Sequence, residues 1–218
     1  FDNDTGGDDG DYVASNAPLN TITNTLSITA WVKRAADQVI YPQIVFWDNP
    51  GLRVGLGLGS TAEEEPTWSV NNELCYHWAD AESSWDWHNG LILPDGEWRF
   101  IALTVQPDMA TLYMSDGAEI KGLRNVAEHV MQDFNDVMYV GWDPSDSTRH
   151  FNGVIDDVRI YKRTLSDAEV LGIAGLSGSY YLPLESWLTD TNDDDSVDMK
   201  DYAVLANYWL EETFFPIP

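Results

Sequence analysis

Short runs of alternating or continuously apolar residues recur along residues 1–162, with turn-forming residues between them. The runs fall at 27–32, 44–47, 98–105, 110–114, 138–141 and 154–161. Asn, Gly, Pro and Asp gather between them, as in DNPG at 48–51 and PDG at 94–96. Many short strand-like runs without helical periodicity predict a mostly β fold, a sandwich of two antiparallel sheets.

Helical patterning begins only after this β region. The stretch SDAE at 166–169 has capping-box spacing, and the apolar residues that follow it predict a short helix. Gly175 and Gly178 then indicate a hinge. Two short helical candidates, at 184–188 and 201–210, flank an acidic loop. We therefore expect two parts, a β-sandwich over 1–175 and a small helical appendage over 176–218.

The acidic loop reads DTNDDDSVDMKD at 190–201, and its oxygen-bearing residues have the spacing of an EF-type calcium loop. Positions 1, 3, 5, 7, 9 and 12 are Asp190, Asn192, Asp194, Ser196 (through its carbonyl), Asp198 and Asp201. Val197 stands at the apolar anchor position, and a helical pattern follows. Asp195 replaces the usual glycine, and Asp201 replaces the usual glutamate. The alternative is a solvated acidic loop without metal.

Charge narrows the range of partners. The chain has 37 acidic and 11 basic residues, a formal net charge of −26. Such a field repels nucleic acid and anionic membranes, and it favours divalent cations or uncharged ligands. No apolar run approaches the roughly 20 residues of a membrane-spanning helix. The single cysteine, Cys75, excludes an intrachain disulfide and reads as a buried small residue. No signal peptide is visible, which suggests a mature or trimmed chain.

The calcium-type loop resembles half of a dockerin repeat, whose pattern D-x-N-x-D-G-x-V-D-x-x-D stands here as DTNDDDSVDMKD. Dockerins pair two such repeats to bind a cohesin on a cell-surface scaffold. The resemblance implies calcium and a possible cohesin-like partner. Only one clear repeat is present here, so the segment either docks a partner or packs on the sandwich.

The stretch FNGVIDDVRIYKRTLSDAEV at 151–170 resembles the closing motif of laminin-G-like, concanavalin A-like jelly-roll domains. Three further stretches resemble strands of that family: GDDGDYV at 7–13, SITAWV at 27–32 and EWRFIAL at 97–103. The resemblance covers residues 1–175. It implies a jelly roll, common in exported bacterial proteins, and loosely a structural calcium.

Asp156 and Asp157 stand side by side in an otherwise apolar strand, where they repel each other unless paired or metal-bound. Arg159 could pair with one of them. A calcium ion could be held by the other together with Asp9 or Asp11 of the opening segment. Both interpretations, a salt-bridged pair and a second calcium site, stay open.

Five of the ten tryptophans fall within residues 68–98, around CYHWADAESSWDWHNG. Sugar-binding modules stack sugar rings on aromatic faces, with polar neighbours that orient the hydroxyl groups. As strand residues, Tyr76 and Trp78 would share one face, and so would Trp85 and Trp87. These four are the candidate ligand-binding residues. The alternative is that they form core, as expected for Trp31, Trp47 and Trp98 in strand-like runs.

The sequence carries no pattern for catalysis. The E-x-D-x-x-E strand of retaining glycosidases of this shape does not occur, nor does a Ser-His-Asp arrangement or a phosphate-binding loop. We expect a non-catalytic, calcium-binding, extracellular recognition or adhesion module of a bacterial cell surface, with a glycan or a matrix protein as partner. The alternatives are a self-assembling subunit of a surface layer or filament, and an accessory module of a larger glycan-degrading enzyme.

Overall fold

The computed structural model describes residues 1, 10–16, 18–36, 38–39, 41–49, 52–59, 71–176 and 180–181. The chain divides into two compact units, Phe1–Tyr181 and Leu182–Pro218. The second unit, and with it the predicted calcium loop at 190–201, lies outside the described residues.

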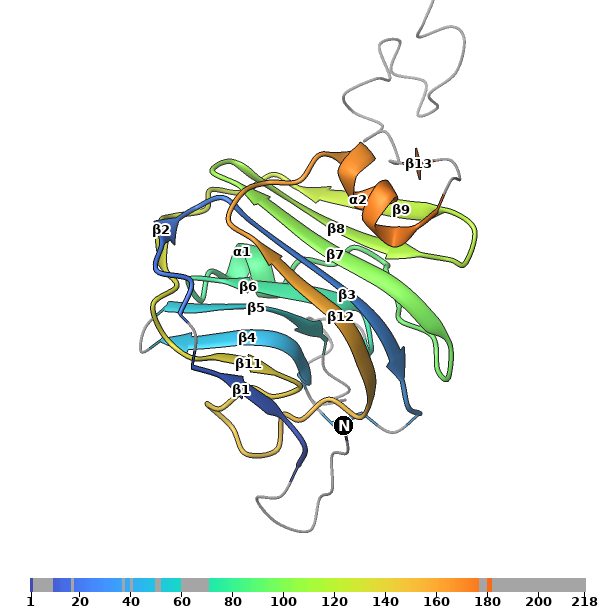
Figure 1. Ribbon diagram of the computed structural model, residues 1–218, viewed down its shortest axis with the longest axis horizontal. Helices are drawn as coiled ribbons and strands as arrows, with labels where there is room; N and C mark the ends of the chain where they lie inside the picture. Colours follow the sequence, from blue (N-terminus) through green and yellow to red (C-terminus); the bar gives the residue numbers. More distant parts are fainter. Residues whose placement is uncertain are drawn as a thin grey trace, which may run out of the picture. The chain divides into compact units, whose positions relative to one another are not determined.

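Two sheets form the first unit (Figure 1), as predicted for the β region. The five-stranded sheet has the order β1-β11-β4-β5-β6, and all its neighbours are antiparallel. Its strands are β1 (Val13–Ser15), β11 (Met138–Val140), β4 (Gln43–Asn49), β5 (Leu52–Leu58) and β6 (Leu74–Trp78). A separate two-stranded ribbon joins β2 (Ile22–Thr23) and β10 (Gln132–Asp133).

The second layer is a six-stranded sheet with the order β12-β3-β7-β8-β9-β13. Its strands are β12 (Gly153–Tyr161), β3 (Leu26–Arg34), β7 (Trp98–Gln106), β8 (Met109–Ser115), β9 (Ile120–Asn125) and β13 (Tyr180–Tyr181). All pairs are antiparallel except β13, which runs parallel to β9. The closing motif at 151–170 thus supplies the edge strand β12 and the start of the helix that follows.

The main core lies between the two sheets, because alternate residues of each strand point to the same face. Fully buried members include Ile28, Ala30 and Val32 of β3, with Leu56 and Leu58 of β5. Burial of such side chains is worth about 1.5–3 kcal/mol each. The hydrophobic contacts between the sheets therefore hold the sandwich together.

The tryptophans expected in the core divide between three environments. Trp47 is 1% exposed in the main core, as predicted. Trp31 is half-buried on the outer face of the six-stranded sheet, 5.7 Å from the Phe100 ring. Trp98 is 41% exposed, so its prediction as a core residue is wrong. The register places Trp98 opposite Lys33 and Trp31 opposite Phe100, two rows that both point away from the core.

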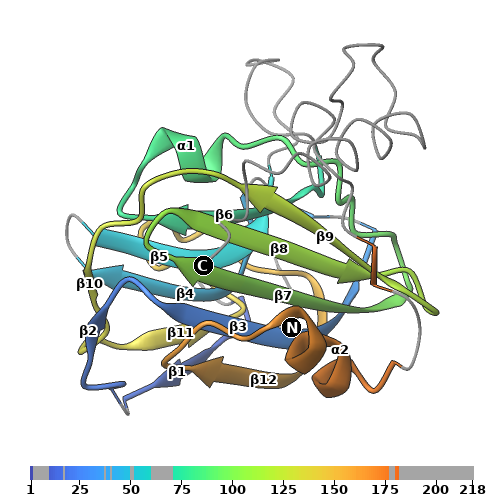
Figure 2. The ribbon, with the colours of Figure 1, turned by 90° about the horizontal axis from the view of Figure 1, so that it is seen from above.

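Helix α2 (Asp167–Ala174) covers part of that outer face (Figure 1). Ser166 caps it as predicted, with the reciprocal contact from Glu169 that completes a capping box. Gly175, with φ of 68°, ends the helix in the left-handed conformation that glycine tolerates. Val170 and Ala174 form a second small core with residues of β7 and β8. The other helix, α1 (Glu82–Trp85), lies on a different side of the sandwich beside β6 (Figure 2).

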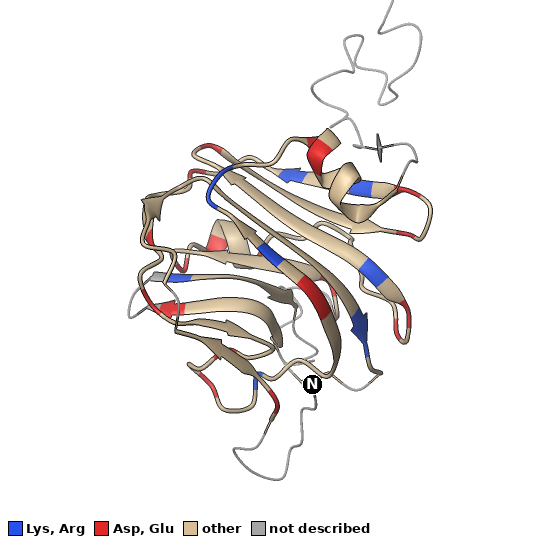
Figure 3. Cartoon of the chain, in the orientation of Figure 1, with Lys and Arg blue, Asp and Glu red and all other residues tan. Residues whose placement is uncertain are grey.

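Charged residues lie mostly in turns and at strand ends of the described chain (Figure 3). The middle of β12 is an exception, with Asp156, Asp157 and Arg159. Within the described ranges no helix is long and apolar enough to cross a membrane.

Candidate functional site

A row of residues crosses the outer face of the five-stranded sheet in direct register. Ala14 of β1 lies opposite Tyr139, Tyr139 opposite Phe46, Phe46 opposite Gly55, and Gly55 opposite His77. A Cβ atom at Gly55 would collide with the Phe46 ring. Glycine therefore leaves room for the Phe46 ring over β5, where the ring also contacts His77.

An open depression of about 330 Å³ lies on this face. Its lining residues are Tyr41, Arg53, His77, Asp80, Trp85 and Arg149. They come from β5, β6, α1 and three connecting segments, so the topology of the sandwich assembles them from distant parts of the chain. The combination of two aromatic rings with charged side chains is typical of small-ligand sites.

Helix α1 is fixed in place by hydrogen bonds at its serines. The Ser84 hydroxyl accepts from the Trp78 backbone N–H at 3.1 Å and donates to the Ala81 carbonyl at 2.6 Å. Asn125 of β9 donates to the Ser83 carbonyl at 2.6 Å. These contacts hold the short helix against β6, and so they position Trp85, at the end of the helix, beside the depression.

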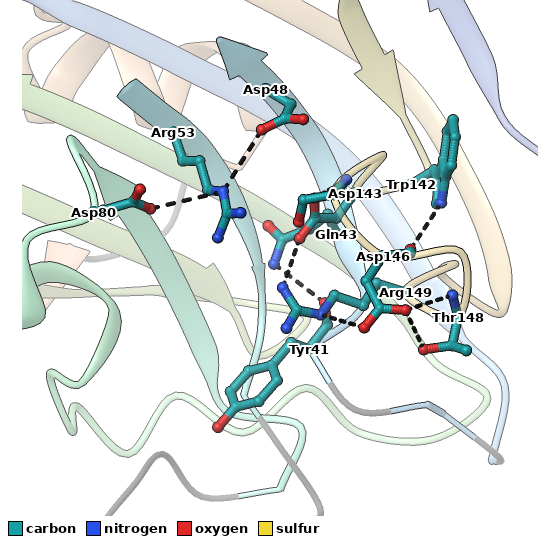
Figure 4. Close-up of polar contacts among 11 residues, drawn as sticks. Tyr41, Gln43, Asp48, Arg53, Asp80, Trp142, Asp143, Asp146, Thr148 and Arg149 are labelled. Atoms are coloured by element: carbon teal, nitrogen blue, oxygen red, sulfur yellow. Dashed lines mark hydrogen bonds and ion pairs between the residues drawn. The ribbon is translucent and has the colours of Figure 1, made fainter. Parts of the chain in front are cut away.

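Arg53 lies between two carboxylates in Figure 4. Its Nε is 3.6 Å from Asp48 Oδ1 and 3.9 Å from Asp80 Oδ1. Both distances exceed those of a hydrogen bond, and the Arg53 side chain is 37% exposed. The two ion pairs orient the guanidinium group, yet they leave most of its N–H groups directed elsewhere.

Arg149 is held more firmly, by the connection between β11 and β12. Its Nη1 donates to Asp143 Oδ2 at 2.9 Å, and Asp143 is fully buried. Asp146 Oδ2 is 3.7 Å from Arg149 Nε (Figure 4). The guanidinium carbon lies 5.4 Å from the centre of the Tyr41 ring, within the range of a cation–π contact.

Two lining residues have left-handed backbone conformations. Tyr41 has φ of 52° and Asp80 has φ of 53°. Ala79, next to Asp80, also has a positive φ, of 55°. Such conformations cost about 1–3 kcal/mol each in residues other than glycine and gather at functional sites. This strain supports assigning a function to the depression.

His77 forms part of the wall and is held neutral. Its ring lies edge-on to Phe46, with centroids 5.6 Å apart, and its buried Nδ1 has no hydrogen-bond partner among the described residues. Burial lowers the pKa of His77 from 6.5 to about 4; Asp143 raises it by a smaller amount, and Arg149 and Arg53 lower it slightly further.

Acid should therefore destabilise the protein through His77. The unfolded chain binds a proton near pH 6.5 and the folded chain only near pH 4, so stability falls as the pH drops between these values. We expect wild type to lose about 2 kcal/mol relative to His77→Gln between pH 7.5 and 5. Urea unfolding of both proteins at the two pH values measures this. An unchanged difference would contradict a neutral His77 with a buried Nδ1.

Tyr76 and Trp78, two of the candidate ligand-binding residues, lie in the main core at 0% and 1% exposure. The Tyr76 hydroxyl accepts from Asn125 at 2.8 Å and lies 3.0 Å from His129 Nε2. Trp78 Nε1 donates to the Val130 carbonyl at 2.7 Å. The prediction that these two rings form a sugar-binding platform is therefore wrong, because β6 directs them between the sheets.

Trp85 and Trp87 do not share a strand face as expected. Trp85 belongs to α1 and lines the depression, whereas Trp87 follows in an irregular segment. Trp87 packs edge-on against Tyr76, with centroids 6.3 Å apart. Of the four predicted aromatic residues, Trp85 is thus the one on the depression.

Tyr41, Arg53, Asp80 and Arg149 are not among the site residues predicted from the sequence. Only one signal pointed to this face: the alternating glycines of RVGLG at 53–57, which leave β5 without a side chain at positions 55 and 57 of its outer side. The bulge of β4 beside Gln43 and the turn after β6 are not visible as patterns.

At the suggested second calcium site, Arg159 forms a two-pronged ion pair with Asp157, with Nε and Nη2 each 2.8 Å from a carboxylate oxygen. This confirms the predicted pairing with arginine. Asp157 has φ of 50° at a shift in register between β12 and β3. The described part of the chain brings no three His, Cys, Asp or Glu residues together, so Asp11, Asp156 and Asp157 do not form a cluster. Asp9 lies outside the described residues.

The six ligands predicted for the C-terminal loop also lie outside the described residues. These are Asp190, Asn192, Asp194, Ser196, Asp198 and Asp201. Their assignment stays a prediction from the sequence.

Several solved structures resemble the fold. Domain 4 of an extracellular GH43 arabinanase from Geobacillus stearothermophilus, solved with arabinotriose, is 19% identical, with a TM-score of 0.49 over 79% of this chain and 84% of that one. A Bacteroides ovatus protein proposed to bind carbohydrate is 14% identical, with a TM-score of 0.50 over 73% of this chain and 43% of that one. Mouse laminin α1 domains LG4–5 are 19% identical, with a TM-score of 0.47 over 72% and 40%. The chain thus spans less than half of the last two.

Among curated proteins, none matches the sequence. A laminin-G family model, described as the concanavalin A-like lectin/glucanases superfamily, matches residues 5–171. These residues contain the strands and the helix of the sandwich up to Leu171, and they agree with the resemblance seen in the closing motif. The chain belongs to the concanavalin A-like lectin/glucanases superfamily.

Proposed function

We propose that the chain is a non-catalytic, extracellular recognition module that binds a glycan in the depression on the five-stranded sheet. The observation that carries the proposal is the pairing of two aromatic side chains, Tyr41 and Trp85, with the polar groups of Arg53, Asp80 and His77 around one open hollow. A sugar ring needs an apolar face for its C–H groups and hydrogen-bonding groups for its hydroxyls.

The family supports this proposal without deciding it. The superfamily name covers lectins and glucanases, and a fold by itself does not fix a function. The Bacteroides ovatus protein of the same fold is proposed to bind carbohydrate. Support for glycan binding by this chain therefore comes from the depression and its side chains.

We propose binding without catalysis because the available groups are unsuited to it. Burial raises the pKa of the Cys75 thiol to about 12, which makes it a poor nucleophile. Among the described residues that line the depression Asp80 is the one carboxylate, whereas glycoside hydrolysis uses a pair.

Glycan binding should depend on Trp85. We expect a soluble polysaccharide from a panel of arabinan, galactan, xylan, polygalacturonate and alginate to retard the protein in affinity electrophoresis. Trp85→Ala should weaken this binding at least tenfold, because stacking of the ring is lost. Trp98→Ala is the matched control, since Trp98 is exposed on the other sheet. Equal retardation of wild type and Trp85→Ala would place binding elsewhere, and no retardation by any polysaccharide would contradict the proposal.

We also propose that the loop at 190–201 binds calcium, on its oxygen spacing alone. Calcium titration calorimetry on chelated protein should show one binding step that Asp190→Ala/Asp194→Ala abolishes. A step that survives in the variant would indicate a second ion elsewhere in the chain. Absence of any calcium binding would leave the loop a solvated acidic stretch. A cohesin-like partner for this segment is part of the same proposal.

A second candidate function, a self-assembling subunit of a surface layer or filament, is favoured by one feature. Ile22, Val130 and Met131 are 58%, 49% and 55% exposed at or beside the β2–β10 ribbon. Exposed apolar groups of this kind occur at contacts between proteins. Concentration-dependent assembly in light scattering, lost in Ile22→Ser/Met131→Ser, would favour it over an isolated module.

A further inference from the structure

We propose that the depression selects a sugar that carries a carboxylate, a uronic acid, and holds it between Arg53 and Arg149. The inference rests on the proposed function and adds to it the chemical class of the ligand. Both arginines line the same hollow. They are two of only 11 basic residues in a chain with a net charge of −26, so two arginines around one hollow are a notable local concentration of basic side chains.

Arg53 offers donors that its own neighbours do not use. Its contacts with Asp48 and Asp80 involve Nε, at 3.6 and 3.9 Å. Figure 4 shows the two terminal nitrogens of Arg53 on the side away from both carboxylates. These two ion pairs are the contacts found for the guanidinium group of Arg53 among the described residues, and neither is short enough to be a hydrogen bond. The planar pair of terminal nitrogens matches the two oxygens of a carboxylate.

Arg149 offers a second, better anchored group. Its Nη1 donates to the buried Asp143, and its Nε is buried 3.7 Å from Asp146 Oδ2, so the nitrogen left for a ligand is Nη2, for which no hydrogen bond to a described residue is found. Its guanidinium carbon lies 5.4 Å from the centre of the Tyr41 ring, in the range of a cation–π contact. Because Asp143 and Tyr41 fix it, little side-chain entropy is lost when Arg149 binds a ligand.

The charges around the hollow leave recognition to geometry. Four carboxylates, of Asp48, Asp80, Asp143 and Asp146, lie within 4 Å of the two arginines, so these groups give no positive excess that would attract every anion. Attraction to the arginines and repulsion from these carboxylates both grow in proportion to the charge of the ligand. The choice of a carboxylate therefore rests on the fit of its two coplanar oxygens to a guanidinium group.

The size of the hollow sets the length of ligand that it holds. Its volume of about 330 Å³ lies at the lower end of the roughly 300–1,000 Å³ of small-ligand pockets. One or two sugar units therefore fill it. Trp85 and Tyr41 provide apolar surface for the ring, while the two arginines take its carboxylate.

The test compares acids with their esters. Trimers of galacturonate, glucuronate and mannuronate, each beside its methyl ester, are titrated into the protein by calorimetry at 0.15 M salt. We expect at least one free acid to bind tenfold or more tightly than its ester, which keeps the rings and removes the charge. Arg53→Gln should abolish this preference, Arg53→Lys should retain part of it, and Trp98→Ala should leave it unchanged.

The outcomes separate this inference from the proposed function. If acid and ester bind equally and both depend on Trp85, the depression binds glycans but the carboxylate inference is wrong. If the acid is preferred and Arg53→Gln keeps the preference, the two arginines are not the reason for it, and the inference is again overturned. If neither the trimers nor the polysaccharide panel bind, the proposed function falls together with it. Thermal unfolding of each variant shows that the sandwich is intact.

Discussion

Replacing Trp78 with alanine should lower the free energy of unfolding by about 3–5 kcal/mol. The side chain is 1% exposed and lies edge-on to His129, with centroids 5.6 Å apart. Its Nε1 donates to the Val130 carbonyl at 2.7 Å, so truncation also leaves a backbone acceptor unpaired. The loss combines a cavity between the sheets with a broken buried hydrogen bond. Urea unfolding followed by tryptophan fluorescence and circular dichroism measures it.

Trp98→Ala is the matched control for this change. Trp98 is 41% exposed at the start of β7, on the outer face of the six-stranded sheet. Its removal should cost about 1 kcal/mol or less. A loss for Trp98→Ala equal to that for Trp78→Ala would contradict the assignment of the two tryptophans to surface and core.

Asp143→Ala should lower the free energy of unfolding by about 2–4 kcal/mol, the cost of separating a largely buried ion pair. Asp143 is fully buried, and besides Arg149 it accepts from the Ser145 backbone N–H at 2.9 Å. The Arg149 side chain is 23% exposed, so water reaches it in part and the loss stays below that of a fully buried pair. The variant should also bind glycan more weakly, because Arg149 loses its anchor in the wall of the depression.

Asp146→Ala tests whether the stability lost in Asp143→Ala comes from the buried position of that carboxylate or only from its negative charge beside Arg149. Asp146 lies 3.7 Å from Arg149 Nε, and its side chain is 38% exposed. Hydrogen bonds from the Thr148 backbone N–H and hydroxyl lower the pKa of Asp146, so this carboxylate mainly orders its own turn. We expect a loss of about 1 kcal/mol or less. Equal losses for the two variants would contradict a special role of the buried pair.

The sandwich was predictable because its signals are local. Alternation along 27–32 gave β3, and the spacing from Ser166 to Glu169 gave the cap of α2, both as observed. Each signal depends on neighbours two to four residues apart, which a sequence displays directly. Trp98 shows the limit of such local signals, since alternation separates the two faces of a strand but does not say which face is buried.

The depression was not predictable in the same way. Arg53 lies in β5, Tyr41 just before β4, and Arg149 in the connection that follows β11. They meet because β11, β4 and β5 are neighbours in the sheet, which is a property of topology. The aromatic segment was misread because SSW at 83–85 forms a turn of helix instead of a strand. That change of period moves Trp85 onto the depression and separates it from Trp87.

The most direct test of the central claim is to locate a bound sugar on the protein by NMR. The indole N–H signals of the ten tryptophans are followed in ¹H–¹⁵N spectra as the best-binding oligosaccharide is added, and Trp85→Phe identifies the Trp85 signal. If the depression is the binding site, the Trp85 signal moves most and the Trp98 signal stays in place. A Trp85 signal that stays unchanged while another tryptophan moves, at a saturating sugar concentration, would show that the glycan binds elsewhere and contradict the account.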